Sequence, residues 1–151
     1  MSNFFQSIIN PYTVGLSVAW FLAQVLKVPF HYLSYREWDW KMLYESGGFP
    51  SSHSSIVVET ALLLGLREGF DSPYFALAIA LASIVIYDAT HVRREAGIHA
   101  QRLNIIFNEM FADHQFHEEK LREVIGHTPW QVAGGFVLGA GIALIIHFVW
   151  I

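Results

Sequence analysis

The chain has 151 residues, of which 54% are hydrophobic and 15% are charged, and its formal net charge is −4. This composition is too apolar for a typical soluble chain of this length, so we expect one domain embedded in a membrane. The absence of cysteine excludes disulfides, thiolate nucleophiles and cysteine-ligated metals. The sequence has no basic stripe with interleaved aromatic residues, so nothing in it points to a nucleic-acid partner.

Four apolar segments predict an all-α fold, a small bundle of about four membrane helices whose polar loops converge on one face. They are residues 11–33, 52–66, 72–87 and 128–151. The first and last reach the roughly 20 residues needed to span a bilayer. The middle two are shorter, so we expect them to be tilted, partly re-entrant or shielded by neighbouring helices. The start of the chain has no basic residue before its apolar run, which favours a retained first helix over a cleaved signal peptide.

The basic residues predict the orientation of this bundle. If the four segments cross in turn, residues 31–51 and 88–127 lie on one side, and these loops together with Lys27 hold eight of the nine Lys and Arg residues. Arg67 is the exception. Because cytoplasmic loops collect Lys and Arg, we expect the long loops inside and both termini outside.

The turn Pro50-Ser51-Ser52-His53 joins a polar loop to the second apolar helix. The free N–H groups and positive dipole of a first helical turn attract phosphate, and the two serines add hydroxyl donors. His53 could pass a proton to a leaving oxygen. The alternative is an ordinary helix cap, with Pro50 before a capping Ser51 or Ser52.

Glu59 lies inside the second apolar segment. An ionisable group at membrane depth faces a partner or a wet cavity, and Lys27 is the candidate partner. A buried ion pair, a Lys27 that reaches to the membrane border, and a direct catalytic role for Glu59 all stay open.

The third apolar segment continues into a polar helix, where Asp88, His91 and Glu95 could share a face. This spacing allows a divalent ion, but no second His/Glu pair of a recognised metal motif accompanies it, and we predict no metal and no cofactor. Arg93 and Arg94 either mark the membrane border or clamp a phosphate.

His127 precedes Thr128 and Pro129, which we expect to cap and begin the last helix. His127 then lies on a loop at the same face as His53, so the two form a candidate nucleophile and proton donor. By contrast, His114 and His117 stand in a charged run that predicts a solvated surface.

These motifs together resemble the divergent branch of the type 2 phosphatidic acid phosphatase and vanadium haloperoxidase superfamily. The resemblance covers nearly the whole chain from about Lys27. In chain order the motifs are Pro50-Ser51-Ser52-His53-Ser54, Asp88 with Val92-Arg93-Arg94 and Ala96-Gly97, Leu103-Asn104, and Gly126-His127-Thr128-Pro129 with Gln131-Val132 and Gly135.

The resemblance implies hydrolysis through a phospho-histidine, with His127 as the nucleophile and His53 as the acid and base. Backbone N–H groups and cations would stabilise the charge on the phosphoryl oxygens. The phosphate-binding residues implied are Ser51, Ser52, Lys27, Arg36, Arg93, Arg94 and Arg122. Asp88, Glu123 and Gln131 would support them.

The sequence also departs from the pattern of the larger superfamily. Eight residues separate Lys27 from Arg36 where six are usual, and Glu37 replaces proline. Ser52 replaces a glycine of the turn, and Arg122 precedes His127 by five positions instead of six.

Gln131 occupies the place of the aspartate that orients the nucleophile. An amide accepts a hydrogen bond but does not offset imidazolium charge, and the analogous Asp to Asn change in serine proteases costs about 10⁴ in rate. Activity would then be slow or absent unless Glu123 substitutes. The chain also lacks helices of larger relatives, whose cover a homodimer would supply.

Two functions therefore stay open. One is a membrane phosphatase acting on a lipid phosphate, or on an isoprenyl phosphate or diphosphate. The other is a catalytically inactive phosphate-lipid binder or membrane scaffold, and a vanadate-dependent peroxidase is a distant third. Hydrolysis needs both His53 and His127, whereas binding needs mainly the cations and the helix N-terminus.

Overall fold

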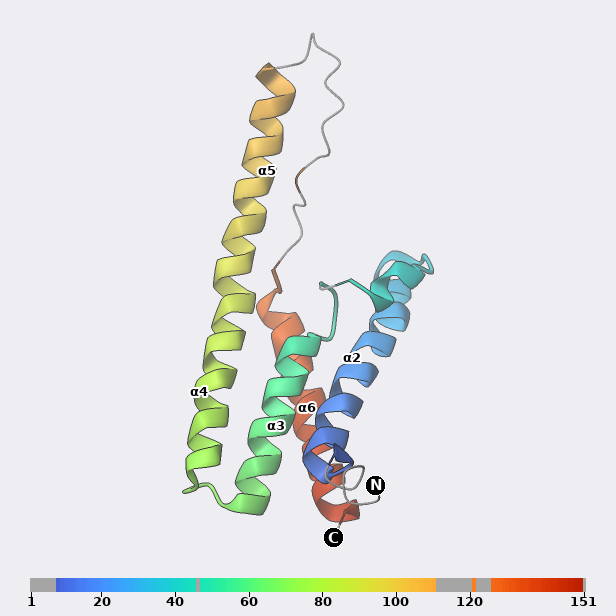
Figure 1. The fold of residues 1–151 in the computed structure, drawn as a ribbon. Coiled ribbons are helices and arrows are strands. Elements are labelled where there is room, and N and C mark those ends of the chain that lie inside the picture. The colour runs from blue at the N-terminus through green and yellow to red at the C-terminus, as the bar shows by residue number, and fades with distance from the viewer. Residues whose placement is uncertain (1–7, 46, 111–120, 122–125, 151) are drawn as a thin grey trace.

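The computed structural model describes residues 8–45, 47–110, 121 and 126–150. Over these residues the regular structure is helical, which confirms the predicted all-α fold (Figure 1). The elements in order are α2 (Pro11–Tyr35), the short 3₁₀ helix η1 (Trp40–Leu43), α3 (Ser52–Glu68), α4 (Pro73–Tyr87), the π-helix η2 (Asp88–Val92), α5 (Arg93–Met110) and α6 (Pro129–Val149). Within the described residues, three runs are long and apolar enough to cross a membrane: α2, α4 with its continuation into α5, and α6.

Local sequence signals explain where the four bundle helices begin. The side chains of Asn10, Ser51, Ser72 and Thr128 each accept hydrogen bonds from backbone N–H groups in the first turns of α2, α3, α4 and α6. These bonds satisfy donors that have no partner within the helix. The cap of α3 is therefore Ser51, and Ser52 is the first helical residue. The predicted cap and first position of the last helix are confirmed.

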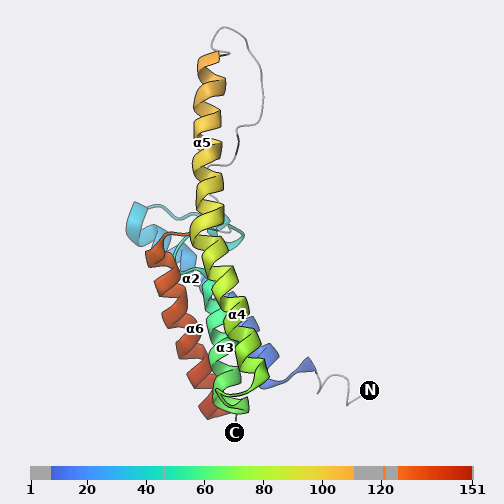
Figure 2. The same ribbon diagram turned by 90° about the vertical axis from the view of Figure 1, so that its left-hand side faces the viewer.

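Helix α3 is the centre of the bundle, because it packs against α2, α4 and α6. In the view of Figure 2, α4 and α6 lie on either side of it. Close packing depends on glycines of the neighbouring helices. A Cβ on Gly135 would lie 2.3 Å from the carbonyl oxygen of Ser51, and one on Gly139 would lie 2.3 Å from that of Ser55. The short α3 is thus shielded by its neighbours, which is one of the arrangements expected for it.

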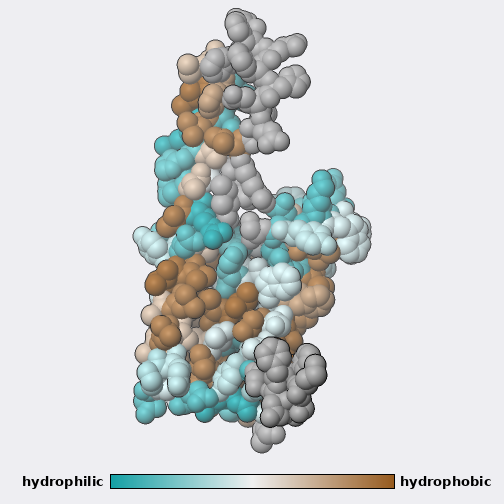
Figure 3. All heavy atoms as spheres, viewed as in Figure 1, coloured by the Kyte–Doolittle hydropathy of each residue, from teal (hydrophilic) through white to brown (hydrophobic). Residues whose placement is uncertain are grey.

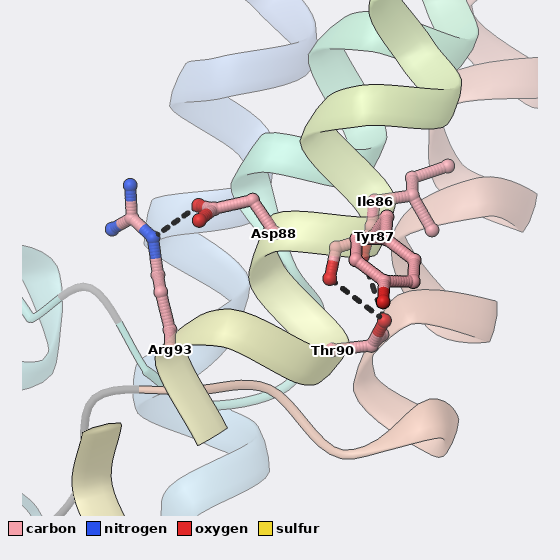
Figure 4. A network of polar contacts seen from close by, with 5 residues as sticks. All are labelled: Ile86, Tyr87, Asp88, Thr90 and Arg93. Carbon is pink, nitrogen blue, oxygen red and sulfur yellow. Dashed lines mark hydrogen bonds and ion pairs between the residues drawn. The ribbon is translucent and has the colours of Figure 1, made fainter. Parts of the chain in front are cut away.

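Helices α4 and α5 form one rod interrupted by the π-helix η2, and α5 extends beyond the bundle (Figure 1). At the junction the hydroxyl of Thr90 donates to the carbonyl oxygens of Ile86, at 2.8 Å, and Tyr87, at 3.4 Å (Figure 4). Such back-bonding and the wider π turn commonly accompany a local change in helix register. The predicted continuation of the third apolar segment into a polar helix is confirmed.

The start of α2 and the end of α6 lie at the same end of the bundle (Figure 1). There Tyr12 donates to the carboxylate of Glu68, and Arg67 donates to the carbonyl oxygen of Trp150 at 2.8 Å. On the face drawn in Figure 3, hydrophobic side chains form a belt between polar side chains at the two ends of the bundle. This distribution is that of an integral membrane protein.

Of the arrangements left open for Glu59 and Lys27, the buried ion pair is wrong. The ammonium of Lys27 donates to the carbonyl oxygen of Glu45 at 2.7 Å, at the polar end of the bundle. Glu59 lies deeper, beside Gly15 of α2, where an added Cβ would overlap its Oε1. Gly15 and Lys27 are 12 positions apart on α2, a rise of about 18 Å, so one carboxylate does not reach both.

Candidate active site

Two main-chain hydrogen bonds join three distant segments of the chain at the polar end of the bundle. The N–H of Ser51 donates to the carbonyl oxygen of Gln131 at 3.0 Å, which ties the start of α3 to the first turn of α6. The N–H of His127 donates to the carbonyl oxygen of Ala89 at 2.9 Å, which ties the loop before α6 to η2. Three elements therefore meet around His127.

His53 and His127 lie side by side in this region. Their ring centroids are 5.9 Å apart and the rings are inclined at 61°. His127 is 2% exposed, whereas His53, in the first turn of α3, is partly accessible. The Nδ1 atom of His53 has no hydrogen-bond partner among the described residues. The structure thus brings together the two imidazoles that the sequence placed on one face.

Gln131 fixes the tautomer of His127. Its Oε1 accepts from the N–H of Thr128 at 3.0 Å, so this atom is the amide oxygen. The same oxygen lies 3.2 Å from Nδ1 of His127, and a hydrogen bond there requires the proton to be on Nδ1. Nε2 then carries the lone pair. The amide therefore orients the ring without adding a negative charge.

The surroundings of His127 favour its neutral form. Burial lowers its pKa below the usual 6.5, and the positive charges of Lys27 and Arg93 and the neighbouring His53 act in the same direction. The hydrogen bond to Gln131 opposes them by raising the pKa. Burial also lowers the pKa of His53, and Arg93 and Lys27 act in the same direction while Asp88 opposes them. Two cations and a neutral imidazole therefore share the site.

The serines of the turn are buried. Ser51 is fully buried, and its hydroxyl oxygen accepts from the N–H of Ser54 at 3.3 Å and from the hydroxyl of Ser54 at 3.0 Å. Ser52 is 4% exposed. The capping role of Ser51 is confirmed, and contact of either serine with phosphate stays a prediction.

Asp88 and Arg93 form an ion pair across η2, with the guanidinium Nε 2.6 Å from Oδ2 (Figure 4). His91 has separate partners, because it stacks on the ring of Tyr87 and lies 2.8 Å from the hydroxyl of Thr90. Asp88 and His91 therefore do not converge on one ligand position. Among the residues that the structure describes, no cluster of three or more His, Cys, Asp or Glu side chains could hold a metal.

The other predicted site residues lie around or beyond this centre. Arg94 is exposed, and its backbone lies against Gly126, where an added Cβ would be 2.5 Å from the Arg94 nitrogen. Arg36 is exposed in a left-handed conformation that ends α2. Arg122, Glu123, His114 and His117 lie outside the described residues.

Some residues that shape the site carried no recognised chemical motif. The carbonyl groups of Ala89 and Glu45 position His127 and Lys27, yet main-chain oxygens have no sequence signal. Gly135 and Gly139 did carry one, because small residues four positions apart let two membrane helices approach closely. That spacing could have predicted the contact between α3 and α6.

The model of the Divergent PAP2 family, where PAP2 is the type 2 phosphatidic acid phosphatase, matches residues 9–142 and so includes the whole candidate site. The chain belongs to the Divergent PAP2 family. It is similar to the "Uncharacterized membrane protein YuiD" of Bacillus subtilis (strain 168), with 36% identity over 137 residues that cover 83% of this chain and 87% of the relative. No solved structure matches the chain. This member of the Divergent PAP2 family is thus an integral membrane protein related to those phosphatases.

Proposed function

We propose that this Divergent PAP2 family protein is a membrane phosphatase that hydrolyses a lipid phosphate or diphosphate through a phospho-histidine. The observation that carries the proposal is the pair of imidazoles, 5.9 Å apart, with His127 held by Gln131 in the tautomer that a nucleophile needs. Family membership and the neighbouring cations Lys27 and Arg93 support it.

In the first step, Nε2 of neutral His127 attacks phosphorus. The N–P bond forms while the bond between phosphorus and the leaving oxygen breaks. His53 donates a proton to that oxygen, and the negative charge of the bound phosphate favours the protonated form of His53 that this step needs. The Nδ1–H of His127 keeps its bond to Gln131, so the positive charge of the modified ring is stabilised by an amide dipole. This stabilisation is weaker than that of a carboxylate.

In the second step, neutral His53 takes a proton from water, whose oxygen attacks phosphorus. The N–P bond breaks, its electron pair returns to Nε2, and inorganic phosphate leaves. Lys27, Arg93 and the N-terminal N–H groups of α3 would stabilise the phosphoryl oxygens in both steps, because charge builds up on those oxygens during phosphoryl transfer.

The same proposal places the site on the cytoplasmic side. Eight of the nine Lys and Arg residues fall in or beside the two long loops, and positively charged loops remain inside. A substrate would then come from the cytoplasmic leaflet.

The test is phosphate release by the purified protein in detergent, from phosphatidic acid and from isoprenyl phosphates and diphosphates. We expect release that disappears in His127→Ala and His53→Ala but persists in His99→Ala, a control at an exposed position of α5. An aryl phosphate with a good leaving group needs no acid, so it should still phosphorylate His127 in the His53→Ala protein. That trapped phospho-histidine would be detected by mass spectrometry.

A non-catalytic phosphate-lipid binder is the second candidate, and Gln131 favours it because an amide does not offset imidazolium charge. It would be the better account if the folded wild-type protein bound phosphatidic acid but released no more phosphate than His127→Ala. In that case binding should depend on Lys27 and Arg93 and not on the two histidines.

A further inference from the structure

An apolar groove of about 440 Å³ runs between α3, α4 and α6. Val58 and Ala61 of α3 form its base, Ile79 and Ile86 of α4 form one wall, and Phe136 of α6 forms part of the other. Ile79 and Phe136 are 45% and 55% exposed, so the groove opens on the outer surface between α4 and α6. In Figure 2 these two helices flank α3 on the side facing the viewer.

Among the residues that the structure describes, the lining of the groove offers no free polar donor to a ligand. Ser83 is the one hydroxyl-bearing residue of that described lining, and its hydroxyl donates to the carbonyl oxygen of Ile79 at 2.8 Å within α4. Phe70 and Phe75 line the end away from the histidines, with ring centroids 5.1 Å apart in an edge-to-face arrangement. An occupant must therefore be apolar along its whole length.

The other end of the groove approaches the candidate active site. Ile86 lies one turn below Ala89, whose carbonyl oxygen holds the backbone of His127. From Phe75 to Ile86 the lining of α4 covers 11 positions, a rise of about 16 Å. This is most of the length of α4, so the groove runs from beside the site to the connection between α3 and α4 at the opposite end of the bundle.

We propose that this groove holds one hydrocarbon chain of the lipid whose phosphate is processed between His53 and His127, an inference that rests on the proposed function. The substrate class is then a phosphorylated lipid with a chain long enough to follow α4, not a water-soluble phosphate. Membrane lipid is as apolar as the groove, so the groove gains little free energy from apolar burial alone. Its role is to direct the head group upward to His127 through packing against the chain.

The first test uses photolabelling, which reports on the groove whether or not phosphate is released. A phosphatidic acid with a photoactivatable group near the end of one chain is incorporated into phosphatidylcholine vesicles with the full-length protein. We expect labels at Phe70 and Phe75. Ala140→Phe, which fills the α6 wall of the groove, should reduce this labelling roughly fivefold because the ring displaces the chain. Ala80→Phe, the same change at an exposed position of α4 outside the lining, should leave it unchanged.

Labelling that is spread evenly over exposed membrane-facing residues such as Leu77 and Leu81 would overturn the proposal that the groove binds the chain, if it is also equal in the wild-type protein and both variants. A phosphatidylcholine probe with the same chains that labels Phe70 and Phe75 equally well would overturn its link to the phosphate site.

Phosphate release decides the proposed function separately. In Ala140→Phe we expect slower release from long-chain phosphatidic acid and unchanged release from a short-chain soluble analogue. Equal loss with both substrates in a folded protein would count against the groove. Groove labelling without any release by the wild-type protein would refute hydrolysis and leave the chain-binding groove standing.

Discussion

Replacement of Gln131 by Glu is the most direct test of how His127 is activated. The substitution keeps the length of the side chain, so one carboxylate oxygen can still accept from the N–H of Thr128 and from Nδ1 of His127. The residue is in the first turn of α6, where a negative charge is favourable with the helix dipole. The substitution therefore adds a charge while preserving the local fold.

The expected magnitude follows from the contact. Oε1 lies 3.2 Å from Nδ1, and His127 is 2% exposed, so solvent screens the new charge little. A neutral hydrogen bond contributes about 1 kcal/mol and one to a charged group about 2.5 kcal/mol, a difference of about 1.5 kcal/mol. This difference corresponds to an increase of about one unit in the pKa of His127, and to about tenfold in the rate of forming the charged phospho-histidine.

The assay is the pH dependence of kcat/KM for lipid phosphate release. Burial lowers the pKa of His127, so the neutral nucleophile of the wild-type protein should persist below pH 6.5. In Gln131→Glu we expect the acid limb to move upward by about one unit and the limiting rate to rise about tenfold.

Thr128→Ala is the control for the cap of α6. It removes the side-chain cap without adding charge, so it should lower Tm and leave the acid limb in place. A folded Gln131→Glu protein with the wild-type limiting rate and acid limb would refute the reasoning. Titration of His127 by NMR in micelles measures its pKa even if no phosphate is released.

Three further predictions concern packing, charge and stability. Gly139→Ala should lower the free energy of unfolding by about 2 kcal/mol, because the added Cβ overlaps the α3 backbone. Gly141→Ala, whose added Cβ meets nothing within 4 Å, should be neutral or stabilising. Thermal denaturation in detergent measures both variants, and equal effects would contradict the packing argument. Arg93→Gln should weaken the binding of phosphatidic acid vesicles about tenfold, because it removes a cation beside the two histidines. Arg102→Gln, at an exposed position of α5, should leave that binding unchanged. An equal loss of vesicle binding in both variants would argue against a specific contact between Arg93 and the phosphate. Because the folded-state pKa of His127 is below its unfolded value, its contribution to stability is present above about pH 6.5 and is lost as the pH falls from there toward the folded pKa. The Tm should therefore decline more steeply with acidification in the wild-type protein than in His127→Gln. Equal slopes of Tm against pH in the two proteins would show that His127 does not cause the loss of stability.

The active-site prediction depended on local features that were combined through topology. The cap Thr128 could be predicted, and the cap of α3 could be narrowed to Ser51 or Ser52, because a cap uses hydrogen bonds within about one helical turn. Antiparallel crossings then placed the starts of α3 and α6 at one end, so His53 and His127 were expected to meet. The π-helix at Asp88–Val92 could not be predicted from the expected shared face, because it changes the helical register of that segment.

The Glu59 prediction failed because depth along a helix is a tertiary property. The start of α3 fixes Glu59 at eight positions beyond Ser51, about 12 Å down the helix axis. Which residue of α2 lies opposite depends on how closely the helices approach, and Gly15 provides the space for the carboxylate. The apolar pattern of a helix does not predict which residue of a neighbouring helix lies at the same depth.

By itself, the sequence determined the membrane setting, the starts of the bundle helices to within one residue and the resemblance to phosphatases, because apolar runs, caps and motifs act over short stretches of chain. Only the tertiary structure decided the 5.9 Å separation of His53 and His127, the partner of Lys27 and the groove beside α3. These features require residues far apart in the chain to pack at a particular depth and register. That depth and register are set by close contacts between helices, such as those at Gly135 and Gly139.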